Sequence, residues 1–152
     1  MSEYSWPEDI DLTVKNKIGI GTSNPEAELH VLGQLLGAAQ DTSGNSLRIC
    51  CGKTPEGSTN WQPYVGGIEG IYVDVDTSAC GFQSTPIYLV NMHGNGTNWE
   101  TTGGSSPYNR TNQGFRVYVR FSNDRDGRPN LTPEFANHND RKWHIQWLAI
   151  GN

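Results

Sequence analysis

Long apolar runs are missing from this sequence. A membrane-spanning helix needs roughly 20 consecutive apolar residues, and no stretch approaches that length, so we expect no membrane insertion. Residues 1–9 (MSEYSWPED) carry acidic side chains where a secretory signal has a basic and then an apolar run. We therefore expect synthesis in a cytoplasm, without a signal peptide. An extracellular or particle-bound location would be reached by assembly or release.

Basic residues are also few. The 152-residue chain has 11 Lys and Arg against 16 Asp and Glu, which gives a formal net charge of −5, and no basic cluster offsets it locally. Such a chain repels a polyanion on average. We therefore expect no nucleic-acid partner.

Cysteine is scarce, with three in the chain. Three cysteines cannot all pair within one chain, and a disulfide between the adjacent Cys50 and Cys51 would be strained. The count favours buried thiols. The alternative is one disulfide from Cys80 to Cys50 or Cys51, with the remaining cysteine free or linking protomers.

The usual enzyme motifs are absent, including Cys-x-x-Cys, His-Glu-x-x-His and Gly-x-Ser-x-Gly. Residues 52–54 (GKT) resemble the end of a phosphate-binding loop, but Leu47 stands where that loop requires glycine. Asp74 and Asp76 could form a catalytic carboxylate pair. They alternate along the strand in step with Tyr72, however, so they lie on its polar side, and a solvated face is favoured. We expect no enzymatic activity and no cofactor.

One segment is a near match to a calcium-binding loop. It contains Asp124, Asp126 and Gly127, but Ser122 occupies the first position and Pro133 stands where the closing glutamate belongs. An Asp-Gly pair between two strands is more simply a hairpin turn. We therefore expect no metal site.

Glycine, proline and aromatic residues are abundant: 18 Gly, 8 Pro and 10% aromatics, with only 34% hydrophobic residues. This mixture favours short strands joined by turns, in a sandwich or small barrel. Phe115, Val117 and Val119 alternate with polar neighbours, as in a strand with one buried face. Strand signals occur at residues 47–51, 71–75, 86–92, 115–121, 132–136 and 143–150.

Residues 1–46 differ in kind from the rest. Residues 17–33 (KIGIGTSNPEAELHVLG) contain two short β-type pieces around a turn at residues 24–25. Alone they cannot bury their apolar side chains. The stretch resembles the GIGTxxPxxxLHVxG element of phage tail fibres and related bacterial surface fibres, which sits in trimeric shafts. The resemblance implies a homotrimer, with residues 1–46 as a fibre-like trimerisation segment and linker.

Residues 47–152 carry a second resemblance. The segments at residues 78–90 (SACGFQSTPIYLV), 114–120 (GFRVYVR) and 143–151 (WHIQWLAIG) are similar to the strand pattern of the H-type lectin domain. That family implies a six-stranded antiparallel β-sandwich that trimerises. It also implies binding of galactose or N-acetylgalactosamine in grooves between protomers.

The lectin resemblance places the family's strand arginine on Arg116 and its loop histidine on His138. The chain departs from the family at Asn137, where the family has tryptophan, and at residues 52–54, where its ligand aspartate is missing. Sugar recognition uses planar hydrogen-bonding groups and an aromatic face. The predicted ligand-binding residues are Arg116, Tyr118, His138, Asn139, Asp140, Trp99 and Tyr108.

Other aromatic and histidine residues have more ordinary interpretations. Alternation predicts that Trp143 and Trp147 lie in the core. His144 is expected to be solvated on a strand face. Trp61 and Trp99 lie in loops, where packing under the loop and stacking on a ligand are equally open.

Taken together, the two resemblances predict a host-attachment protein. The head of a phage or phage-derived tail fibre would bind cell-surface glycans of the galactose or N-acetylgalactosamine type. The alternatives are a structural cap that ends the trimer without binding sugar, and a free-standing soluble H-type-like lectin.

Overall fold

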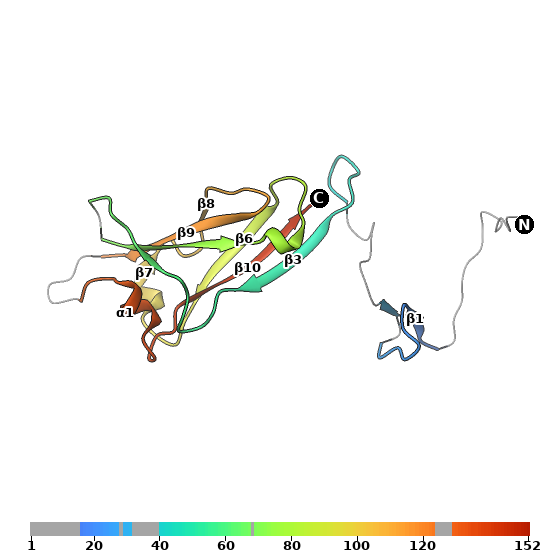
Figure 1. Cartoon of the computed structure of the whole chain (residues 1–152), viewed down its shortest axis with the longest axis horizontal. Coiled ribbons are helices and arrows are strands. Elements are labelled where there is room, and N and C mark those ends of the chain that lie inside the picture. Colours follow the sequence, from blue (N-terminus) through green and yellow to red (C-terminus); the bar gives the residue numbers. More distant parts are fainter. Residues whose placement is uncertain (1–15, 28, 32–39, 68, 124–128) are drawn as a thin grey trace, which may run out of the picture. The chain divides into compact units, whose positions relative to one another are not determined.

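The computed structural model describes residues 16–27, 29–31, 40–67, 69–123 and 129–152 (Figure 1). The chain divides into two compact units, Met1–Leu36 and Gly37–Asn152. The predicted boundary after residue 46 stays a prediction, and residues 34–39 of the predicted linker lie outside the description. No helix in the described part is both long and apolar enough to cross a bilayer.

The first unit contains two short strands, β1 (Ile18–Ile20) and β2 (Leu29–Val31). Both predicted β-type pieces are therefore confirmed. The strands pair in parallel, with Ile18 opposite Leu29. One such pair offers little apolar cover, and the Ile20 side chain is left 55% exposed.

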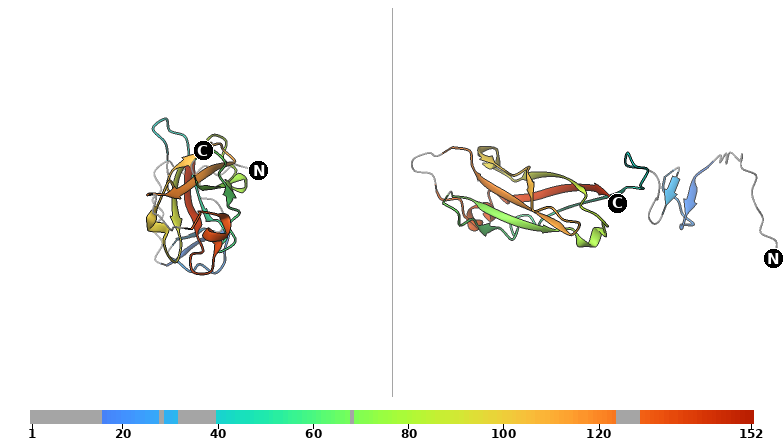
Figure 2. Two further views of the ribbon diagram at one scale, coloured as in Figure 1. Left: turned by 90° about the vertical axis from the view of Figure 1, so that its left-hand side faces the viewer. Right: turned by 90° about the horizontal axis from the view of Figure 1, so that it is seen from above.

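The second unit is an all-β sandwich of two antiparallel sheets (Figure 2). The three-stranded sheet has the order β3 (Arg48–Lys53), β10 (His144–Gly151), β6 (Ile87–His93). The five-stranded sheet consists of β4 (Gln62–Pro63), β5 (Ile71–Asp76), β9 (Gly114–Phe121) and β7 (Thr101–Thr102) in that order, with β8 (Pro107–Tyr108) also paired to β9. The all-β antiparallel class is confirmed.

The predicted strand at residues 132–136 is wrong. The segment forms helix α1 (Pro133–Asn137), because Thr132 caps it by accepting a hydrogen bond from the Phe135 N–H at 3.1 Å. Proline at the first helical position loses no backbone hydrogen bond there. The predicted hairpin turn at residues 126–127 lies outside the described part. The segment expected to form the second strand of that hairpin is helix α1.

The core lies between the two sheets. Phe115, Val117 and Val119 point inward as predicted, each at most 3% exposed. The ring centroids of Tyr88 and Phe115, from opposite sheets, are 4.6 Å apart. Trp143 is fully buried, as predicted.

Two further tryptophans complete the core. Trp147 packs against it, as predicted, and its ring covers Gly52, where an added Cβ would lie 2.7 Å from the ring. Trp61 is also buried, and its indole N–H donates to the Trp143 carbonyl at 3.1 Å. For Trp61, packing under the loop is therefore the correct interpretation.

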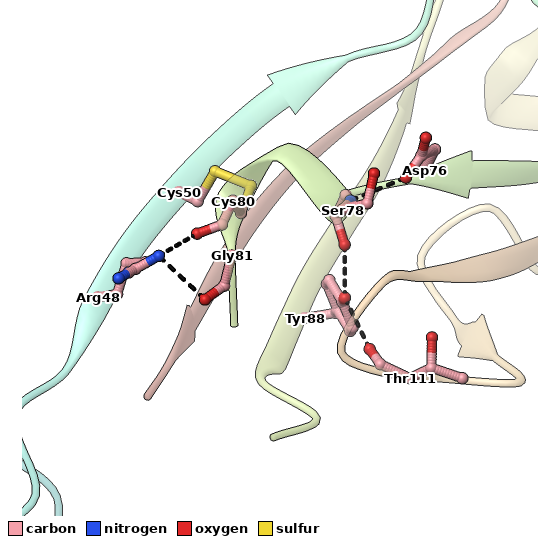
Figure 3. The surroundings of a disulfide bond; sticks show 9 residues. Arg48, Cys50, Asp76, Ser78, Cys80, Gly81, Tyr88 and Thr111 are labelled. Atoms are coloured by element: carbon pink, nitrogen blue, oxygen red, sulfur yellow. Dashed lines mark hydrogen bonds between the residues drawn. A yellow bond between two sulfur atoms is a disulfide. The ribbon is translucent and has the colours of Figure 1, made fainter. Parts of the chain in front are cut away.

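Cysteine pairing differs from the favoured prediction. Cys50 and Cys80 form a disulfide (Figure 3). Cys51 is free and exposed. Alternation along β3 explains the choice, because neighbouring residues of a strand point to opposite faces. The bond joins β3 to the 3-10 helix η1 (Ser78–Cys80). Arg48 reinforces the junction by donating from Nη1 to the Cys80 carbonyl at 2.6 Å.

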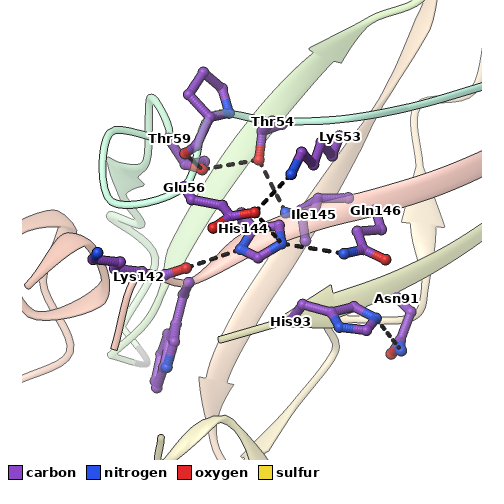
Figure 4. A network of polar contacts seen from close by, with 12 residues as sticks. Lys53, Thr54, Glu56, Thr59, Asn91, His93, Lys142, His144, Ile145 and Gln146 are labelled. Carbon is purple, nitrogen blue, oxygen red and sulfur yellow. Dashed lines mark hydrogen bonds and ion pairs between the residues drawn. The ribbon is translucent and has the colours of Figure 1, made fainter. Parts of the chain in front are cut away.

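A polar network fixes the loop after β3 (Figure 4). The Thr54 hydroxyl accepts the Ile145 N–H at 2.9 Å and lies 2.8 Å from the Thr59 hydroxyl. His144 Nδ1 lies 2.9 Å from the Lys142 carbonyl. The prediction that His144 is solvated is wrong, because its residue is only 6% exposed.

Candidate functional site

A cluster of polar and aromatic side chains lies on the outer face of the five-stranded sheet. Tyr72 stands directly opposite Tyr118, and Asp74 directly opposite Arg116, on the paired strands β5 and β9. Opposite residues of an antiparallel pair share a face. Strand register therefore gathers all four side chains.

Arg116 is held firmly within this cluster. Its Nε and Nη2 donate to Asp74 Oδ1 and Oδ2, both at 2.6 Å. Its guanidinium carbon lies 4.1 Å from the centroid of the Tyr72 ring, and Nη1 donates to the Tyr118 hydroxyl at 3.4 Å. These contacts use most of the guanidinium N–H donors in hydrogen bonds within the chain, and they hold the Tyr118 hydroxyl in place.

The ion pair also sets the protonation state of the cluster. Hydrogen bonds from Arg116 lower the pKa of Asp74 below its ordinary value of 3.8. The same hydrogen bonds raise the pKa of Arg116 further above its usual range. Both groups are therefore charged at neutral pH.

Two further tyrosines, one after β4 and one in β8, complete an aromatic groove beside this pair. The Tyr64 and Tyr108 rings meet the Tyr118 ring edge to face, with centroids 5.5 and 5.2 Å away. A cavity of about 550 Å³ lies between them. We call it the tyrosine groove, and its lining includes Tyr64, Tyr108, Tyr118, Glu69, Ser106 and Arg120.

The two carboxylates considered as a catalytic pair lie in a neighbouring hollow of about 460 Å³. Asp74 is engaged by Arg116. Asp76 accepts the Ser78 N–H at 2.8 Å, and this backbone bond lowers its pKa. Both carboxylates therefore stabilise the local structure through bonds within the chain.

Three of the seven predicted site residues come together in this region: Arg116, Tyr118 and Tyr108. Tyr118 and Tyr108 line the groove, while Arg116 lies next to it. Trp99 is elsewhere, in the 3-10 helix η2 (Asn98–Glu100), with 76% of its surface exposed. It precedes β7, which pairs with the far end of β9 at Phe121.

The other three predicted residues, 138–140, lie in the exposed turn after α1. His138 Nδ1 is 3.4 Å from Asp140 Oδ2. Helix α1 meets β9 at its far end, where Phe135 contacts Phe121. Phe121 lies five positions beyond Arg116 along β9, a distance of about 17 Å. Within one chain, the predicted loop histidine and strand arginine therefore do not form one site.

The cluster also contains residues that the sequence did not indicate as ligands. Tyr72 and Asp74 were identified as one polar strand face, but their position beside Arg116 depends on the pairing of strands 42 residues apart. Tyr64 follows the short strand β4 in a loop without clear periodicity. No local pattern would have assigned it to the groove.

Comparison with known proteins gives no match: no family model, curated protein or solved structure resembles this chain significantly. The tail-fibre and lectin resemblances therefore stay predictions. Among the residues that the structure describes, no group of three or more His, Cys, Asp or Glu side chains could hold a metal ion. The chemistry of the groove is therefore the basis for assigning a function.

The Arg116–Asp74 pair should make stability depend on pH in the acid range. Because the folded-state pKa of Asp74 is depressed, its contribution is complete above about pH 4 and is lost as the pH falls through the folded-state pKa. Asp74 is 63% exposed, so we expect at most about 1 kcal/mol. Urea unfolding should find Asp74→Asn less stable than the wild type at pH 7, with a smaller difference at pH 2. An equal difference at both pH values would contradict this linkage.

Proposed function

We propose that residues 47–152 form a carbohydrate-binding head that recognises cell-surface glycans of the galactose or N-acetylgalactosamine type. The observation that carries the proposal is the tyrosine groove. It combines three tyrosine rings with polar groups in one cavity of about 550 Å³, within the range of roughly 300–1,000 Å³ common for small-molecule sites.

The chemistry of the groove suits a sugar ring. A pyranose has apolar C–H patches that pack on aromatic faces and hydroxyl groups that need donors and acceptors. Tyr118 and Tyr108 supply ring surface, while Glu69, Ser106 and Arg120 supply an acceptor, a hydroxyl and a cation. The Arg116–Asp74 pair keeps the Tyr118 hydroxyl in place, so the groove is partly preorganised.

The wider role that we propose is host attachment by a homotrimeric phage or phage-derived tail fibre. It is supported by the motif at residues 17–33 and by the exposed Ile20 of the short β1–β2 pair. Single sugar sites are weak, and three heads on one fibre would raise the avidity without any new contact. On this proposal the protein belongs to the particle and acts outside the cell.

A glycan array probed with the intact chain tests the proposal. We expect retention on glycans that end in galactose or N-acetylgalactosamine, and competition by the free monosaccharide. The Arg120→Ala variant removes a cation from the groove and should weaken this retention. A folded trimer that binds no glycan would contradict the proposal and support a structural cap. Galactose binding by a protein that never joins a particle would support a free-standing lectin.

A further inference from the structure

Part of the outer face of the three-stranded sheet is apolar, although a solvated antiparallel sheet face is ordinarily polar. In one row Ile150 lies between Ile49 and Ile87, and in the next Leu148 lies between Cys51 and Leu89. The exposed fractions are 63% for Ile49, 66% for Ile87 and 55% for Leu89. We call these six residues the apolar face.

We propose that the apolar face is a contact surface between copies of this chain. The opposite outer face of the sandwich is built differently, with the Arg116–Asp74 pair and the tyrosines. The outer face of the five-stranded sheet is therefore polar and aromatic, whereas the apolar face exposes aliphatic side chains to water. This inference does not depend on glycan binding.

Charge favours a second copy as the occupant. The chain has a net charge of −5, yet none of its 16 acidic residues lies in β3, β6 or β10. Glu56, in the loop that follows β3, is bound to Lys53 at 2.7 Å, so the two charges offset each other. Two copies can therefore approach each other through this sheet without electrostatic repulsion between carboxylates. Contact through the acidic parts of the surface would bring like charges together.

The remainder of this outer face is polar and can also pair with itself. Beyond Leu148 along β10 comes Gln146, flanked by Lys53 and Asn91, and then His144 beside His93 (Figure 4). The His93 and His144 rings are 5.9 Å apart, and Asn91 lies 3.2 Å from His93. Amide and imidazole groups both donate and accept, so a copy of the same surface can satisfy the exposed Asn91 and His93, whereas His144 is buried and bonded within the chain.

The sheet presents a small, continuous surface for a contact between copies. Three strands about 4.8 Å apart and about 25 Å long present roughly 350 Å² on one face. Two such faces bring together about 700 Å², less than the roughly 1,000 Å² of a specific interface, so this sheet would form one part of the contact between copies.

Cys51 provides a direct probe, since it lies within the apolar face and the other two cysteines are joined. In the full chain we expect maleimide to label Cys51 slowly while light scattering reports a multiple of 16.8 kDa. Leu89→Glu buries a charge at the contact and should speed labelling at least tenfold. The matched control is Val65→Glu, because Val65 is an equally aliphatic residue, 93% exposed in a loop. In the Val65→Glu variant, Cys51 should react with maleimide at the same rate as in the wild type.

The outcomes separate the possible occupants. The proposal is overturned if the wild type is a monomer, or if its Cys51 labels as fast as in Leu89→Glu. Protection of Cys51 in a monomer also overturns it, because the chain's own N-terminal segment would then cover the face. Faster labelling in a variant that stays oligomeric supports the proposal, with the first unit maintaining the assembly. If circular dichroism shows that Leu89→Glu is unfolded, Ile87→Ser replaces it in the same comparison.

Discussion

Replacing Tyr118 with alanine is expected to abolish glycan binding while the chain stays folded. The Tyr118 ring contacts Tyr64, Tyr72 and Tyr108, and its hydroxyl accepts a hydrogen bond from Arg116. Truncation therefore removes the centre of the groove. The affinity per site should fall at least about 100-fold, in the range of other central aromatic contacts. Isothermal titration with the best ligand from the array measures the effect.

Two further variants identify the source of that loss. Tyr118→Phe keeps the ring and removes the hydroxyl, so it should lose only about tenfold, the value of one hydrogen bond. Trp99→Ala removes an aromatic residue that is 76% exposed and does not line the groove, so this variant should bind like the wild type. If Trp99→Ala loses binding and Tyr118→Ala retains it, the η2 loop is the ligand site.

The sandwich core could be predicted because it depends on strand alternation. Phe115, Val117 and Val119 repeat every second residue, and only one side of a strand can face the core. The same rule placed Arg116 and Tyr118 on the outer face. Alternation failed at residues 132–136, where the hydrogen bond that the Thr132 side chain accepts at the start of the helix outweighs the strand signal of a short segment.

The candidate site was predicted only in part because it is assembled from distant segments. Tyr108 reaches the cluster because β8 pairs with β9 opposite Arg116, and no local pattern reveals that pairing. His138 was placed beside Arg116 by analogy, whereas the structure puts it in a turn near the other end of β9. His144 also follows the polar alternation, yet the loop after β3 covers it, and Glu56 of that loop lies 3.8 Å away.

Loss of the Cys50–Cys80 disulfide should have the largest effect on stability. The bond links residues 30 positions apart, so it restricts the unfolded chain considerably. The chain-entropy relation for a loop of this length gives about 3.6 kcal/mol. The folded junction keeps other support, because Arg48 still binds the Cys80 and Gly81 carbonyls and the Tyr88 hydroxyl donates to the Thr111 carbonyl.

Urea unfolding of a Cys50→Ala/Cys80→Ala variant measures this contribution. We expect the free energy of unfolding to fall by about 3 to 4 kcal/mol, which is a large share of the 5 to 15 kcal/mol typical of a domain. Cys51→Ser is the matched control, since that thiol makes no disulfide and its change should stay within about 0.5 kcal/mol. Both variants are compared at a concentration where they have the same mass in solution. A fall below about 1 kcal/mol would mean that the bond between β3 and η1 contributes little beyond the hydrogen bonds of Arg48 and Tyr88.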